Sequence, residues 1–202
     1  GDGFTGIRFA QDNTLASVAN TFQAVIIDTP VRSGSIHSPY KQPVGRRLAR
    51  GGLALAYGMK EVHSVDPVVQ GAVLTANAAA ITVTVGGLGT KGSVAAVVGS
   101  DGFEVLGNCG STQNPHGQCE GPCLCWASVP IASFTASTVT LSKGLPPNPV
   151  AVRYLWYIAP YGTVPFTAPV YATGAPQLPG VNISMSDPSW DLLPLGPFIR
   201  RL

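Results

Sequence analysis

One histidine stands where acid–base chemistry could be built. The apolar run 22–27 is rich in β-branched residues, which predicts a strand covered on both faces, and it is followed directly by Asp28. A polar loop comes next and carries His37, and a helix is predicted over 43–57. Catalytic groups in sheets covered by helices gather at the carboxyl ends of strands. His37 could therefore take the proton of a serine hydroxyl while a carboxylate orients its ring.

No nucleophile signature accompanies this histidine. The sequence has no G-x-S-x-G motif, and Ser33, Ser35 and Ser38 occupy ordinary loop positions. Asp28 is the nearest carboxylate upstream of the histidine, so it is the candidate for orienting the imidazole. The alternative for Asp28 is a turn-capping role before Thr29. The residues alone therefore indicate a base and a candidate acid without the group that they would activate.

The residues around His37 resemble the histidine block of the sialate O-acetylesterase family. Residues 34–48 read G-S-I-H-S-P-Y-K-Q-P-V-G-R-R-L, and the family's block is close to G-S-I-H-P-x-x-K-Q-x-V-x-x-R-L. Members are serine esterases of the flavodoxin-like class called SGNH hydrolases. The similarity extends more loosely to other segments: A-L-A-Y-G at 54–58, I-R-F-A-Q at 7–11, residues 103–105, the cysteine cluster, Trp126 and residues 151–156.

The resemblance implies that His37 is the catalytic general base. It also implies that the nucleophilic serine and the oxyanion hole lie on an N-terminal chain of the same precursor, because no G-Q-S-N block is present. Gly34 occupies the place, three residues before the histidine, where many such hydrolases carry the triad Asp. Asp28 is left as the candidate acid. We therefore expect the C-terminal subunit, or a C-terminal fragment, of an enzyme that removes O-acetyl groups from sialic acids, with no metal and no organic cofactor.

Two other functions fit the same sequence. One is a non-catalytic secreted glycoprotein module with a structural or adhesive role. The other is an acetylesterase of the same fold acting on other acetylated polysaccharides. The sequence of the N-terminal chain separates the first from an enzyme, because an intact serine block favours catalysis. Assays on both substrate classes separate the second.

The four cysteines favour an oxidising compartment. They lie close together in a Gly- and Pro-rich stretch, at Cys109, Cys119, Cys123 and Cys125. An even count in such a segment predicts two disulfides, with three connectivities left open. The alternative is a zinc knot, but the spacing lacks the paired C-x2-C of the usual structural zinc sites. The sequon at Asn182 agrees with a glycosylated protein that is secreted or lysosomal.

Composition excludes several other classes. Charged residues make up 11% of 202 residues and the net charge is +2, so nucleic acid is not an expected partner. No apolar run is long enough for a membrane span. At 45% hydrophobic residues, the chain can bury a substantial core.

The elements that must position these groups divide the chain near residue 62. The expected fold class is α/β plus all-β: residues 1–62 as the C-terminal piece of an SGNH catalytic domain, 63–180 as an antiparallel β-sandwich, and 181–202 as an extended arm. In the predicted helix, Val44, Leu48, Gly52 and Leu55 form the apolar stripe, and Arg46, Arg47 and Arg50 face outward. Strands are predicted at 69–74, 80–85, 94–98, 103–106, 138–141 and 150–157.

Overall fold

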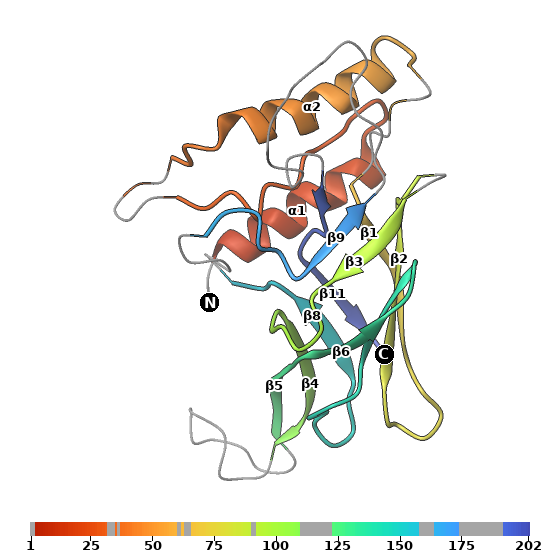
Figure 1. Ribbon diagram of the computed structural model, residues 1–202. Coiled ribbons are helices and arrows are strands. Elements are labelled where there is room, and N and C mark those ends of the chain that lie inside the picture. The colour runs from red at the N-terminus through yellow and green to blue at the C-terminus, as the bar shows by residue number, and fades with distance from the viewer. Residues whose placement is uncertain are drawn as a thin grey trace.

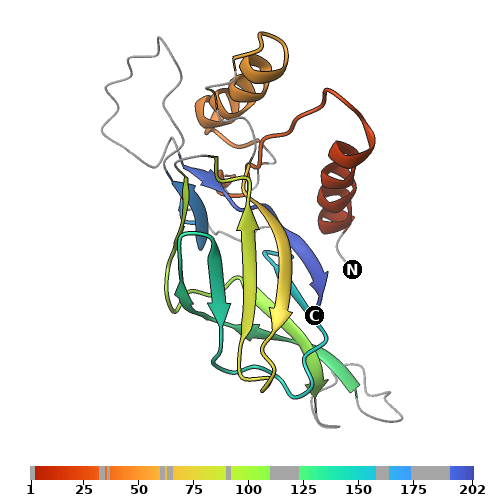
Figure 2. The ribbon, with the colours of Figure 1, turned by 90° about the vertical axis from the view of Figure 1, so that its right-hand side faces the viewer.

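The computed structural model describes residues 3–31, 35, 37–59, 62, 66–89, 92–109, 123–157, 164–173 and 192–202. Two helices come first, α1 (Gly3–Ser17) and α2 (Lys41–Leu55). Eleven strands follow in the described residues: β1 (Val68–Leu74), β2 (Ile81–Gly86), β3 (Ser93–Ala96), β4 (Phe103–Cys109), β5 (Cys123–Val129), β6 (Ile131–Phe134), β7 (Thr138–Leu141), β8 (Ala151–Tyr154), β9 (Val170–Thr173), β10 (Leu193–Pro194) and β11 (Phe198–Arg201). The described chain is thus mostly antiparallel sheet with two helices, of which α2 lies beyond one end of the strands and α1 lies beside them (Figures 1 and 2).

Three sheets of the described strands share one core. Their strand orders are β1-β2-β7-β6, β10-β9-β3 and β11-β8-β4-β5, and the pairings within them are antiparallel. Alternation fills the core, because every second residue of a strand points inward. Val83 and Val105 are fully buried in this way, and the ring of Phe103 packs 4.7 Å from that of Tyr154. Burial of one such side chain contributes roughly 1.5–3 kcal/mol, so this core makes the β-domain a stable platform.

The end of the chain belongs to this platform. We predicted an extended arm over 181–202, and of this range the structure describes 192–202. Strand β11 pairs with β8 and β10 pairs with β9, while Leu195 and Phe198 are buried in the core. Residues 192–202 therefore complete the sheets of the β-domain.

The prediction of a strand at 22–27 was wrong. The described structure has no strand there, and Ile26 is 46% exposed. A fully covered strand needs neighbouring strands on its edges, and none of the described strands pairs with this segment. The apolar run therefore lies in an extended connection between the two helices.

The predicted helix is confirmed as α2, but the face that it buries is not the expected apolar stripe. Gly58 has a φ of 66°, which ends the helix and lets the Met59 N–H reach the Leu53 carbonyl at 3.1 Å. The buried residues of α2 are Pro43, Arg47, Arg50 and Gly51, whereas Leu48 and Leu55 of the apolar stripe are 43% and 47% exposed. The expectation that Arg47 and Arg50 face outward is thus wrong.

Helix α1 was not predicted from the sequence. Thr5 is its only buried residue, and Phe4 and Ile7 are each 57% exposed. Two contacts join α1 to the chain after β8: Arg8 Nη1 donates to the Tyr157 carbonyl at 2.6 Å, and the ring of Phe9 lies 6.2 Å from that of Trp156. Figure 2 shows α1 and α2 standing apart from each other on this side of the molecule.

Candidate functional site

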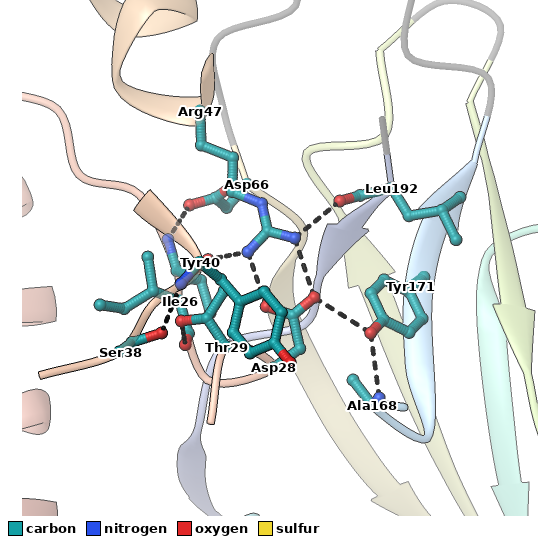
Figure 3. A network of polar contacts seen from close by, with 11 residues as sticks. Ile26, Asp28, Thr29, Ser38, Tyr40, Arg47, Asp66, Ala168, Tyr171 and Leu192 are labelled. Atoms are coloured by element: carbon teal, nitrogen blue, oxygen red, sulfur yellow. Dashed lines mark hydrogen bonds and ion pairs between the residues drawn. The ribbon is translucent and has the colours of Figure 1, made fainter. Parts of the chain in front are cut away.

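Asp28 is held by a buried network at the start of the histidine loop. Its side chain has no exposed surface, and Arg47 Nη1 and Nη2 donate to Oδ1 and Oδ2 at 2.6 and 2.8 Å. The Tyr171 hydroxyl donates to Oδ2 at 3.0 Å (Figure 3). Charge-assisted bidentate pairing is the strongest geometry that a carboxylate and an arginine can form. The hydrogen bonds of the Asp28 carboxylate therefore go to Arg47 of α2 and to Tyr171 of β9.

Arg47 joins this turn to two further segments. Nη1 donates to the Val25 carbonyl at 2.9 Å, and Nη2 donates to the Leu192 carbonyl at 3.1 Å. The buried Nε has no hydrogen-bond partner among the described residues. An arginine is tolerated in such a place because its charge and four of its donor contacts are matched by oxygen atoms. The Arg47 side chain thus ties α2 to residues 21–31, which join the two helices, and to Leu192 just before β10.

Asp66 completes the cluster from the other side. Its Oδ2 accepts the Val25 N–H at 2.7 Å. Burial raises the pKa of this carboxyl to about 6, the negative charge of Asp28 adds to the rise, and the Val25 hydrogen bond and the charges of Arg47 and Arg50 oppose it. We call Val25, Asp28, Arg47, Asp66 and Tyr171 the anchor network.

Tyr171 attaches the anchor network to the β-domain. Its hydroxyl oxygen accepts the Ala168 N–H at 3.0 Å while its proton goes to Asp28. Burial, followed by the negative charge of Asp28, raises the pKa of Tyr171. The phenol consequently stays protonated and remains a hydrogen-bond donor to the carboxylate at neutral pH.

His37 lies exposed on the loop that this network closes. Its backbone N–H donates to Ser35 Oγ at 3.0 Å, and Ser38 Oγ accepts the Tyr40 N–H at 3.2 Å. The Tyr40 ring packs edge-on against that of Phe166, with centroids 5.5 Å apart. Since Asp28 at one end of the loop bonds to Arg47 beyond the other end, the base of the loop is fixed while His37 faces outward.

The structure does not join the predicted acid to the predicted base. Within the described residues, the ring of His37 has no hydrogen-bond partner, and both oxygens of Asp28 are occupied by Arg47 and Tyr171. The described serines of the loop bond to its backbone. Within the described residues, His37 is thus an exposed side chain that is not paired with the buried carboxylate of Asp28.

Sequence reasoning missed Arg47, Asp66 and Tyr171. The arginine was assigned to the solvent face because charged residues ordinarily lie there. The sequence signal that could have indicated a buried arginine was the position of Asp28 at the end of an apolar run. Hydrogen bonds of the anchor network join residues up to 143 positions apart, and no local sequence pattern predicts such contacts.

The cysteines are in two chemical states. Cys123 is disulfide-bonded, while Cys109 and Cys125 are free thiols. Cys119 and the sequon residue Asn182 lie outside the described residues. Among the described residues, no group of three or more His, Cys, Asp or Glu side chains is placed to hold a metal ion. None of the helices in the described ranges is long and apolar enough to cross a membrane.

Comparison with known proteins gives a likeness of fold. No protein-family model matches the chain, and no curated protein matches it. A solved structure, that of a carbohydrate acetylesterase from Xanthomonas citri, aligns over 97% of this chain with a TM-score of 0.65 and 23% identity. The chain spans about a third of that protein's length, since the alignment covers 36% of it.

Proposed function

We propose that this chain is the C-terminal portion of a serine carbohydrate acetylesterase and that it contributes His37 as the general base. The fold likeness to a carbohydrate acetylesterase over 97% of the chain carries this proposal. The loop geometry supports it, because the anchor network fixes the loop at its base and leaves His37 exposed. A reaction on an acetyl ester needs such a base beside a hydroxyl nucleophile.

The mechanism uses one side chain of this chain directly. A serine hydroxyl of the N-terminal chain attacks the acetyl carbonyl while His37 takes its proton. The tetrahedral intermediate collapses, His37 returns the proton to the departing sugar oxygen, and the acetyl group stays on the serine. His37 then takes a proton from water, which attacks the acyl-enzyme and releases acetate. Oxyanion-hole donors come from the N-terminal chain, and no metal or cofactor takes part in this scheme.

Asp28 has a positioning role in this proposal. Its oxygens hold Arg47 and Tyr171, so it fixes the two ends of the histidine loop against each other. A triad role would require the carboxylate to leave this buried pairing, which would strand the charge of Arg47 in a low-dielectric site. The triad role of Asp28 therefore remains only a prediction from the sequence.

The exposed apolar residues of the first 57 positions support a partner chain. Phe4 and Ile7 on α1, Ile26, and Leu48 and Leu55 on α2 are each more than two-fifths exposed. Exposed apolar surface is typical of protein interfaces. We assign them to the N-terminal chain of the same precursor, which would supply the sheet that the run 22–27 lacks. On this interpretation residues 1–62 complete an SGNH domain and 63–180 form an attached β-sandwich.

The substrate is an O-acetylated sugar. We favour sialic acid, on the resemblance of residues 34–48 to the sialate O-acetylesterases, over other acetylated polysaccharides. A secreted or lysosomal location, with glycosylation at Asn182, accords with such a substrate. No residue of the described site selects between the two sugar classes.

The test uses this chain assembled with the N-terminal portion of its precursor. Hydrolysis of 9-O-acetylated sialic acid and of acetylated xylan is measured for the wild type, for His37→Ala and for Lys41→Ala, an exposed position at the start of α2. We expect His37→Ala alone to abolish acetate release from the preferred substrate. Equal activity of the three proteins would overturn the role of His37, and no activity in any of them would favour a non-catalytic module.

A further inference from the structure

We infer that Cys109 and Cys125 form the second disulfide of this protein, which selects one of the three connectivities that the sequence allows. This inference is independent of the proposed function, since it concerns strands β4 and β5. The two cysteines are free thiols in the structure, and they are the only described cysteines in that state. Pairing them leaves Cys119 as the partner of Cys123.

The strand register puts these sulfur atoms on the same face. Cys109 lies opposite Cys123 and Gly107 lies opposite Cys125 in the antiparallel pair. Residues directly opposite share a face, as do residues two apart on one strand. Cys109, Cys123 and Cys125 therefore all point to the side on which Phe103 and Val105 are buried.

Gly107, which lies opposite Cys125, leaves space on this face that the turn 145–148 fills. A Cβ at Gly107 would lie 2.7 Å from Pro146 Cγ, so the turn 145–148 closes over this face. Cys109 Sγ lies 3.3 Å from the Cys123 carbonyl oxygen, which places it against the backbone of β5. The neighbouring Cys109 side chain, more than burial, raises the pKa of the Cys125 thiol.

The thiols differ in access, which sets the order of oxidation. Cys125 is partly exposed, whereas Cys109 is buried. With a small disulfide such as oxidised glutathione, the Cys125 thiolate attacks one sulfur and releases one reduced glutathione. The Cys109 thiolate then attacks Cys125 Sγ and releases the second. Two protein thiols lose two electrons and two protons, and one glutathione disulfide is reduced. Because the thiolate is the attacking species, the first step should accelerate as the pH rises toward the raised pKa of Cys125.

The test is peptide mapping of the 202-residue chain after equilibration with oxidised glutathione and alkylation of remaining thiols. Lys or Arg does not occur between Cys109 and Cys125, so cleavage after Glu120 is used to separate the first two cysteines from the last two. We expect the two resulting peptides to be joined, and electron-transfer fragmentation to assign Cys109 to Cys125. Separable peptides, a Cys109–Cys123 bond, or alkylation of both Cys109 and Cys125 would overturn the inference.

A matched pair of variants tests it without relying on one digest. Cys109→Ala/Cys125→Ala should show the mass gain of one disulfide on full reduction, with no alkylation before reduction, whereas the wild type should show that of two. Cys109→Ala/Cys123→Ala removes one cysteine from each proposed pair, so it should leave both remaining thiols open to alkylation. The same outcome for both variants would contradict the assigned pairing.

Discussion

The buried pair of Asp28 and Arg47 should be the most sensitive point of the first 60 residues. Their side chains are 0% and 2% exposed, and two hydrogen bonds of 2.6 and 2.8 Å join them. Asp28→Asn keeps the shape but leaves the guanidinium without its counter-charge. Removal of one partner of a buried ion pair costs about 3–5 kcal/mol, because the other charge stays buried. We expect Asp28→Asn and Arg47→Met each to lose this amount of unfolding free energy.

A double-mutant cycle separates the pair from the rest of the site. Once one charge is gone, the other has lost its partner, so the double variant should lose less than the sum of the single losses, by about 2–3 kcal/mol. Urea unfolding followed by tryptophan fluorescence measures all four proteins. Glu104→Gln is the control, because Arg153 holds Glu104 at 2.8 and 2.9 Å with side chains 18% and 11% exposed. Because this pair is less buried, Glu104→Gln should lose less unfolding free energy than Asp28→Asn.

Two results would refute this reasoning. One is a loss below about 1 kcal/mol for Asp28→Asn, which would mean that water or another group compensates Arg47. The other is additive losses, which would mean that the two residues do not act on each other. Activity of the assembled protein adds a further readout. A triad acid lowers kcat by about four powers of ten when it becomes Asn, whereas a positioning residue should leave most of kcat in the folded fraction.

Three further perturbations follow from the geometry. The pKa of Asp66 is about 6 in the folded chain against 3.8 for the free side chain, so the folded state binds more protons between these values and stability falls as the pH rises from 4 to 6. Asp66→Asn should therefore gain about 2 kcal/mol of unfolding free energy over the wild type at pH 7 relative to pH 4, measured by urea unfolding. A pH-independent difference would contradict this. The Cβ of Gly45→Ala meets no atom within 4 Å, so this variant should stabilise α2 by about 1 kcal/mol. The Cβ of Gly107→Ala meets Pro146, so that variant should destabilise the protein by about 1–3 kcal/mol. Thermal melts in which Gly107→Ala is the more stable variant would disprove this. Leu48→Glu should change the Tm of this chain by no more than about 1 °C, since exposed substitutions change stability little. It should nevertheless weaken binding to the proposed N-terminal chain at least tenfold in titration calorimetry. Equal affinity of the variant and the wild type would exclude α2 from the interface.

Sequence patterns predicted the parts of this fold that rest on local information. Alternating apolar residues bounded by Gly and Pro gave six of the strands, and Pro43 with Gly58 gave α2 to within two residues at either end. Helix α1 was missed because its apolar residues do not form a buried stripe. Strand β5 was missed because its cysteines lie in a stretch that reads as loop. The strand predicted at 22–27 failed for another reason, since a strand exists only where neighbouring strands are present.

The candidate site likewise has a part that local sequence predicts and a part that only tertiary packing brings together. His37 was predicted as the base from its neighbours in sequence, and that role stays a prediction; the structure shows the residue exposed on a loop. The anchor network was not found, because Asp28, Arg47 and Tyr171 come together only through tertiary packing. The ion pair with Asp28 buries the arginine face of α2 in place of the expected apolar stripe. Hydrophobic periodicity does not predict such a pairing.

The most direct test of the account is the acetylesterase activity of the assembled two-chain protein with and without the imidazole of His37. The proposal predicts that His37→Ala lowers kcat for an O-acetylated sugar by at least about three powers of ten, with the Tm unchanged, because His37 is exposed. Lys41→Ala should retain the wild-type kcat. A His37→Ala protein that keeps kcat within about tenfold of the wild type would contradict the central claim.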